Sequence, residues 1–98
     1  MEPEPMVAVA DVPVGGGVIL RDRGVVVTQP AEGEFRAFGA VCPHRECVVR
    51  SIAAGTVNCL CHGSRFRITD GSVAGGPSPS GLPEHDVVVV DGMVALRP

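Results

Sequence analysis

The sequence predicts an all-β protein, built as a small antiparallel sandwich or barrel. Short apolar runs alternate with turn signals along both ends of the 98-residue chain. Its thirteen glycines and nine prolines indicate that turns and loops are frequent. No stretch of about ten residues shows the 3.6-residue periodicity of an amphipathic helix, so any helix should be no longer than a turn or two.

Six strands are expected outside the middle of the chain, at residues 6–9, 18–20, 24–29, 35–40, 87–90 and 93–96. Turns at residues 22–23, 32–33 and 91–92 join consecutive strands into hairpins, and Asp-Gly at 91–92 is the strongest short signal of this kind. Residues 1–5 should form a flexible acidic tail. Residues 11–17 contain one proline and three glycines and should form a loop.

The length of the chain predicts a single small domain, residues 1–98. A chain this short buries only part of its unfolded surface, so we expect a disulfide, a metal or a partner to add stability. The net charge of −3 and the absence of Trp and Tyr argue against a nucleic-acid-binding surface. No apolar run approaches the roughly 20 residues that span a bilayer, so no membrane span is expected.

All four cysteines and two of the three histidines lie in two short motifs. The motifs are Cys-Pro-His-Arg-Glu-Cys at residues 42–47 and Cys-Leu-Cys-His-Gly-Ser at residues 59–64. Thiolate and imidazole ligands suit both zinc and iron–sulfur centres. Structural zinc sites typically open with two cysteines and continue with a histidine pair, whereas each motif here combines Cys with His. This arrangement allows one iron to take two cysteines and another iron two histidines.

These motifs resemble the signature of the Rieske iron–sulfur family, which is Cys-x-His, a spacer, and Cys-x-x-His. They are most similar to the disulfide-containing branch, found in cytochrome bc and b6f complexes and in related soluble actinobacterial proteins. That branch reads Cys-x-His-x-x-Cys and Cys-x-Cys-His-Gly-Ser. Fourteen residues lie between His44 and Cys59, slightly fewer than in the family's common spacer. The resemblance implies a Rieske-type antiparallel sandwich with a small cluster-binding subdomain, about residues 40–83, inserted between strands.

The resemblance also implies a Rieske-type [2Fe–2S] cluster and its ligands. Two cysteines would bind the inner iron and two histidines the outer iron near the surface: Cys42, Cys59, His44 and His62. Cys47 and Cys61 would form a disulfide that joins the two motifs. Closing a loop of about 15 residues in this way stabilises a protein by about 3 kcal/mol, if chain entropy is the cause.

Three further residues near the cluster follow from the same resemblance. Ser64 matches a serine whose hydroxyl donates a hydrogen bond to a cluster sulfur, which raises the reduction potential. Phe66 stands where high-potential members carry a tyrosine, so a potential at the top of the family's range is not expected. Pro77 lies in residues 75–79, which resemble the proline loop that covers the cluster. From composition alone, residues 71–81 could equally well form a flexible linker as a folded loop.

The resemblance implies one-electron transfer, by a soluble ferredoxin-like carrier or by the head domain of a larger redox complex. The sequence contains no nucleotide-binding fingerprint and no catalytic Ser/His/Asp spacing. A stand-alone enzyme is therefore not expected, although the domain could belong to an oxidoreductase complex. The alternative is a structural or regulatory zinc-binding module that uses the same two cysteines and two histidines. Two structural disulfides would leave the paired histidines unexplained.

The expected partner is a redox protein that docks at the face formed by His44 and His62, with Pro43 and Leu60 as an apolar rim. Four other charged or titratable residues are expected to be solvated, and the first three could assist docking: Arg45, Glu46, Arg65 and His85. The expected disulfide favours an extracytoplasmic location. The lack of signal-peptide features at the N-terminus favours the cytoplasm if this is the full natural chain.

Overall fold

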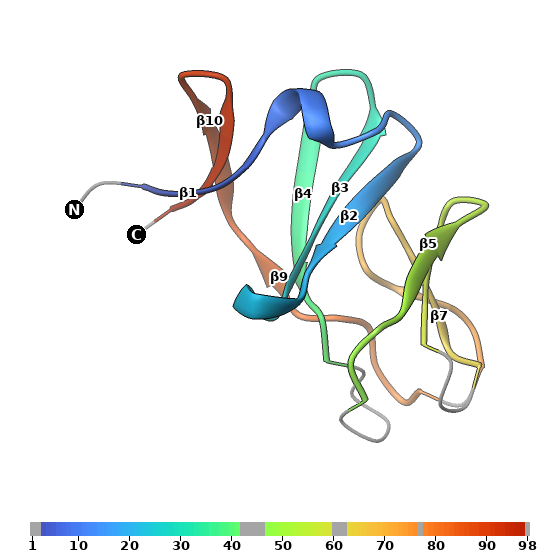
Figure 1. Cartoon of the computed structure of the whole chain (residues 1–98). Helices are drawn as coiled ribbons and strands as arrows, with labels where there is room; N and C mark the ends of the chain where they lie inside the picture. The colour runs from blue at the N-terminus through green and yellow to red at the C-terminus, as the bar shows by residue number, and fades with distance from the viewer. Residues whose placement is uncertain (1–2, 42–46, 60–62, 77, 98) are drawn as a thin grey trace.

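The computed structural model describes residues 3–41, 47–59, 63–76 and 78–97 (Figure 1). These residues form eleven short strands in three antiparallel sheets. The helical segments among them are two three-residue 3-10 turns, η1 (Val9–Asp11) and η2 (Arg21–Arg23). The all-β prediction is therefore confirmed. Within the described part of the chain, no helix is long and apolar enough to cross a membrane.

The first sheet contains the chain ends, in the order β1 (Glu4–Ala8), β11 (Met93–Leu96) and β10 (Val87–Val90). The β10–β11 hairpin is confirmed, and its turn residues Asp91 and Gly92 both have positive φ, at 52° and 75°. Strand β1 begins earlier than expected because Glu4 pairs with Leu96. The expected tail is thus too long by two residues, since Glu4 and Pro5 belong to the strand.

The second sheet is the central layer, in the order β2 (Gly16–Leu20), β3 (Val25–Ala31), β4 (Glu34–Gly39) and β9 (Glu84–His85). Both predicted hairpins, β2–β3 and β3–β4, are confirmed. The expected loop at 11–17 is wrong at its end, because Gly16 and Gly17 pair with β3. A Cβ atom on Gly17 would contact the Val27 carbonyl oxygen at 2.4 Å, so this strand pairing requires a glycine.

The third sheet lies within the segment, about residues 40–83, that was expected to form a small cluster-binding subdomain. Its order is β5 (Ser51–Ala53), β6 (Thr56–Asn58), β7 (Arg65–Arg67) and β8 (Val73–Gly75). Ala54 and Gly55 both adopt positive φ in the tight β5–β6 turn. Figure 1 shows this sheet on the opposite side of the central layer from β1 and β10. The middle of the chain is therefore a folded unit inserted between the strands of the sandwich.

Both faces of the central sheet are covered, which produces two hydrophobic cores. The core toward the first sheet, called the base core here, consists of Val12, Val25, Val27, Ala37 and Val94. The core toward the third sheet, called the site core, consists of Val26, Phe38, Ala40, Val49, Val57, Cys59, Phe66, Ile68 and Leu82. Val25, Val26 and Val27 alternate between the two cores. This alternation explains why β3 begins with three consecutive valines.

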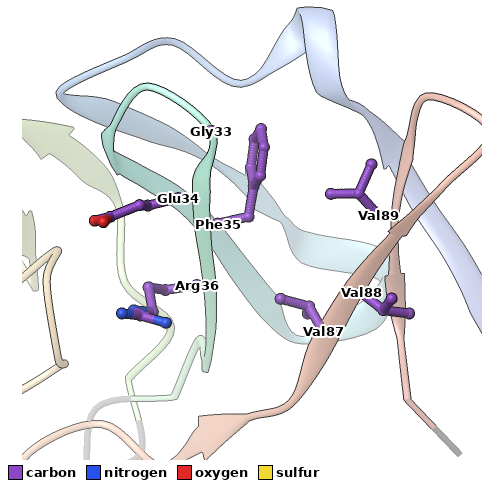
Figure 2. A pocket seen from close by; sticks show the side chains of 7 residues that line it. All are labelled: Gly33, Glu34, Phe35, Arg36, Val87, Val88 and Val89. Atoms are coloured by element: carbon purple, nitrogen blue, oxygen red, sulfur yellow. The ribbon is translucent and has the colours of Figure 1, made fainter.

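A groove opens where the first and second sheets separate beyond β9. It has a volume of about 390 Å³. It is lined by Gly33 and the first three residues of β4 on one side, and by residues 87–89 of β10 on the other. Figure 2 shows the Phe35 ring between the two strands, facing Val89. Phe35 and Val87 also pack against the base core, so this groove belongs to the base of the molecule.

Candidate metal centre

Cys59 directly follows β6 and is the predicted ligand that the structure describes. Its side chain is 1% exposed, lies in the site core and carries a free thiol. The Cys59 N–H donates to the Ser64 carbonyl at 2.9 Å, and the Cys59 carbonyl accepts from Gly63 N–H at 3.1 Å. The described ends of the second motif are therefore hydrogen-bonded to each other, and Cys59 is held directly after β6.

Cys47 lies at the end of the first motif. It is half-buried, packs against the site core, and is not a free thiol. Val41 and Val48 form an antiparallel bridge that closes the base of the first motif. Two residues after this bridge, the Arg50 N–H donates to the Asn58 carbonyl at 3.0 Å. The described residues just after the first motif therefore lie beside the residue that precedes the second motif.

The other predicted site residues lie outside the described residues: Cys42, His44, Cys61, His62 and Pro77. The same holds for the expected docking residues Pro43, Arg45, Glu46 and Leu60. The ligand set and the disulfide pairing therefore stay predictions.

Ser64 is fully buried and lies directly beneath the Gly/Pro-rich tract. The Ser78 N–H donates to Ser64 Oγ at 3.2 Å. A Cβ atom on Gly76, whose φ is +92°, would lie 2.5 Å from the Ser64 Cα. The Ser78 hydroxyl in turn donates to the Ser80 carbonyl at 2.8 Å. The linker interpretation is therefore wrong for the described part of this tract, which packs backbone against backbone on the second motif.

Ser64 also carries an available hydrogen-bond donor. Its oxygen accepts from Ser78, and no described residue accepts its hydroxyl hydrogen. A buried hydroxyl hydrogen usually has an acceptor. Together with the free, buried thiol of Cys59, this donor fits a sulfur-rich group bound beside the two residues.

Phe66 occupies the centre of β7 and is fully buried in the site core with Cys59. It pairs with Val57 on β6. The flanking residues Arg65 and Arg67 are exposed, as the alternation of a strand requires. His85 is exposed as expected, and it lies in the short strand β9 opposite Ala37.

The chain matches the Rieske [2Fe–2S] domain family over residues 3–86. It belongs to this family. It is 34% identical over 91 residues to the cytochrome b6-f complex iron-sulfur subunit of Chlorobaculum tepidum, covering 89% of this chain and 49% of that protein. It is 37% identical over 65 residues to the putative respiratory nitrate reductase subunit Rieske of Haloferax mediterranei, covering 65% of this chain and 30% of that protein. The chain thus spans about half or less of these curated relatives.

Solved structures share the fold of this Rieske domain over nearly its whole length. The plasma membrane Rieske protein PetC3 of Synechocystis PCC 6803 has a TM-score of 0.75 at 25% identity, covering 96% of this chain and 98% of that one. A ferredoxin of Sphingomonas yanoikuyae B1 has a TM-score of 0.79 at 21% identity, covering 99% of this chain and all of that one. The second likeness shows the fold alone.

The family membership confirms the predicted cofactor and chemistry. A Rieske domain holds a [2Fe–2S] cluster and transfers one electron at a time. The zinc-binding alternative has no support among the relatives. Electron transfer by the cluster is the role that the family and these relatives support for this domain.

Proposed function

We propose that this Rieske domain relays single electrons between redox proteins, as a ferredoxin-like carrier or as the head domain of a larger redox complex. The proposal rests on the family match over residues 3–86. The free, buried thiol of Cys59 beside Ser64 agrees with it, because it suits a cluster ligand. The bound cluster would accept one electron and pass it on. The chain supplies its ligands, its cover against water and the surface that meets the partner.

Two cysteines and two histidines would hold the cluster: Cys42, Cys59, His44 and His62. The burial of Cys59 in the site core suits a ligand of the inner iron, which must be kept from water. The hydrogen bond from Arg50 to Asn58 supports the assignment, because it brings the chain just after the first motif against the residue that precedes the second. The redox partner would then dock at the face that His44 and His62 form.

Cys47 and Cys61 would form a disulfide between the two motifs. Cys47 supports this pairing because it is half-buried and not a free thiol. The bridge would hold the motifs together when the cluster changes charge. A stable disulfide also favours an extracytoplasmic location, where the environment is oxidising.

Ser64, Phe66 and Pro77 would set the surroundings of the cluster. The Ser64 hydroxyl would donate to a cluster sulfur, because Ser78 already fills its acceptor role. Phe66 has no hydrogen to donate, and the tract that contains Pro77 would exclude water. We therefore expect a reduction potential within the family's range of about −150 to +300 mV, but below its upper end.

The test replaces each histidine of the chain with alanine and records the visible spectrum. His44→Ala and His62→Ala should each abolish the Rieske spectrum, because each removes a ligand of the same iron. His85→Ala is the matched control, since His85 is exposed on β9, and should leave the spectrum unchanged. With neither Trp nor Tyr present, the apoprotein absorbs little, so the spectrum reports the cluster. An unchanged spectrum in either of the first two variants would overturn the ligand assignment.

A further inference from the structure

Charge is divided unevenly along the chain. Residues 41–83 contain four arginines and two acidic residues, whereas the rest of the chain contains four arginines and nine acidic residues. The cluster-binding part is therefore cationic in a protein whose net charge is −3. The molecule is 38 Å long, and charges are screened beyond about 10 Å at 0.1 M salt, so local charges should dominate at each end.

Arg65 is placed next to the residues that hold the cluster. It directly follows Ser64, and it pairs across the third sheet with Asn58, which directly precedes Cys59. Arg50 lies on the other side of Asn58, to which its backbone N–H donates. Both guanidinium groups belong to exposed residues. Two cations therefore flank the strand that leads into the cluster ligand.

The Arg65 side chain has a defined position and no acidic partner in the described chain. A Cβ atom on Gly75 would lie 2.6 Å from Arg65 Nη2 and 3.2 Å from Nε, so the guanidinium rests on the Gly75 backbone. The ion pair found among the described residues joins Arg23 to Glu4, in another part of the molecule. Arg67, in contrast, donates to Ser72 and Val73. Arg65 is therefore oriented but not neutralised.

An open groove lies beside Arg65 on the outer face of the third sheet. It has a volume of about 350 Å³, and its lining includes Ser51, Thr56, Asn58, Cys59, Ser64 and Arg65. Its polar groups are ordered, because Thr56 Oγ1 donates to Asn58 Oδ1 at 2.7 Å and Asn58 Nδ2 donates to Ser51 Oγ at 3.4 Å. The groove therefore offers the Arg65 cation at its border and the Ser51 hydroxyl, which donates to no described residue, to an entering carboxylate.

We propose that Arg65 and this groove are a docking point for a carboxylate on the acidic surface of a redox partner protein. The proposal rests on the proposed function and deepens it, because it assigns the partner's charge. The net charge of the whole chain would predict the opposite, a cationic partner. The two expectations differ in sign, so one experiment separates them.

The experiment follows oxidation of the reduced domain in a stopped-flow spectrometer by two forms of cytochrome c. The native form is cationic, and the form with succinylated lysines is anionic. The anionic form should react faster at about 20 mM salt, and its advantage should vanish at about 0.5 M. Arg65→Gln should slow the anionic form about threefold at low salt, as expected for one surface charge. Arg65→Lys should retain most of the rate.

Arg97→Gln is the matched control, because Arg97 is exposed after β11, on the far side of the central sheet. It should leave both rates unchanged. A faster reaction with the cationic form, or an Arg65→Gln variant that slows both forms equally, would overturn the proposal. Failure of the proposed function would look different, since the visible spectrum would be absent and neither form would be reduced.

Discussion

The base core and the site core differ in the strands that enclose them. The base core lies between strands of four to seven residues. The third sheet, which closes the site core, consists of four strands of three residues each. Cys59 belongs to the site core and Cys47 packs against it, whereas the base core contains no cysteine among its described residues. We infer that apolar burial stabilises the base, while the third sheet also depends on the cluster and on the proposed disulfide.

The largest effect is expected where the central and third sheets meet. Phe38 is fully buried in the site core, and a Cβ atom on Gly71 would lie 2.8 Å from its ring. Phe38→Ala should lower the free energy of unfolding by about 3–5 kcal/mol. Chemical denaturation of the cluster-loaded protein measures this, and Phe38→Leu provides a milder variant if the alanine variant does not fold. A loss below about 1 kcal/mol would contradict this packing.

Removal of the proposed disulfide comes next. Cys47→Ser should cost about 3 kcal/mol, because the unfolded chain regains the entropy of a loop of about 15 residues. The cluster should still assemble but should be lost faster on heating. The wild-type protein treated with a thiol reductant is the control and should behave like the variant. Equal thermal stability of Cys47→Ser and untreated wild type would reject the bridge.

A cavity in the base core tests whether the two cores are independent. Val94→Ala should lower the free energy of unfolding by about 2 kcal/mol, from lost burial and the cavity left behind. The reduction potential should stay at the wild-type value, because Val94 lies on the other side of the central sheet from Cys59. Voltammetry alongside denaturation measures both quantities. A shifted potential would show that the two cores are coupled.

A smaller effect is expected from the hydrogen bonds around the cluster. Ser64→Ala should lower the reduction potential by about 60 mV, if the lost hydrogen bond is worth about 1.4 kcal/mol. Phe66→Tyr should raise it, because the new hydroxyl can donate. Ser80→Ala is the control, since the Ser80 side chain is exposed and its backbone carbonyl, which the variant keeps, still accepts from the Ser78 hydroxyl. No change in Ser64→Ala would mean that this hydroxyl does not reach the cluster.

The smallest effect concerns the turn that leads into β8. The Ser72 hydroxyl and N–H both donate to Asp70, and they lower its pKa below the ordinary value of 3.8. Because the folded-state pKa is depressed, the stabilisation is present above pH 3.8 and is lost as the pH falls through the folded value. An NMR titration of the Asp70 carboxyl should show a higher pKa in Ser72→Ala. An unchanged pKa would show that the Ser72 hydroxyl does not donate to Asp70 in solution.

The hairpins were predictable because their signals are local. The Asp91-Gly92 turn requires positive φ at both residues, and the sequence supplies residue types that adopt it. The third sheet was not predictable in this way. A strand such as Arg65–Arg67 has one apolar residue, which is too short a pattern to reveal period-two alternation.

The family of the candidate site was predictable from the two motifs, whereas the packing around the site was not predictable from local structure. The Cys/His spacing carried the family assignment, which the match over residues 3–86 confirms. The contacts that shape the site join distant residues, such as the Ser78 N–H and Ser64 Oγ, which are 14 positions apart. Similarly, Gly76 must be a glycine because it packs on the Ser64 backbone. No property of either residue alone indicates such a contact.

The most direct test of the central claim is an EPR spectrum of the reduced protein, combined with iron and zinc analysis. A Rieske cluster should give two irons per chain and one unpaired electron per cluster. Its average g value should lie below that of a cluster with four cysteine ligands, because two histidines bind one iron. An EPR-silent, zinc-containing protein would contradict the claim. So would an average g value typical of all-cysteine ligation.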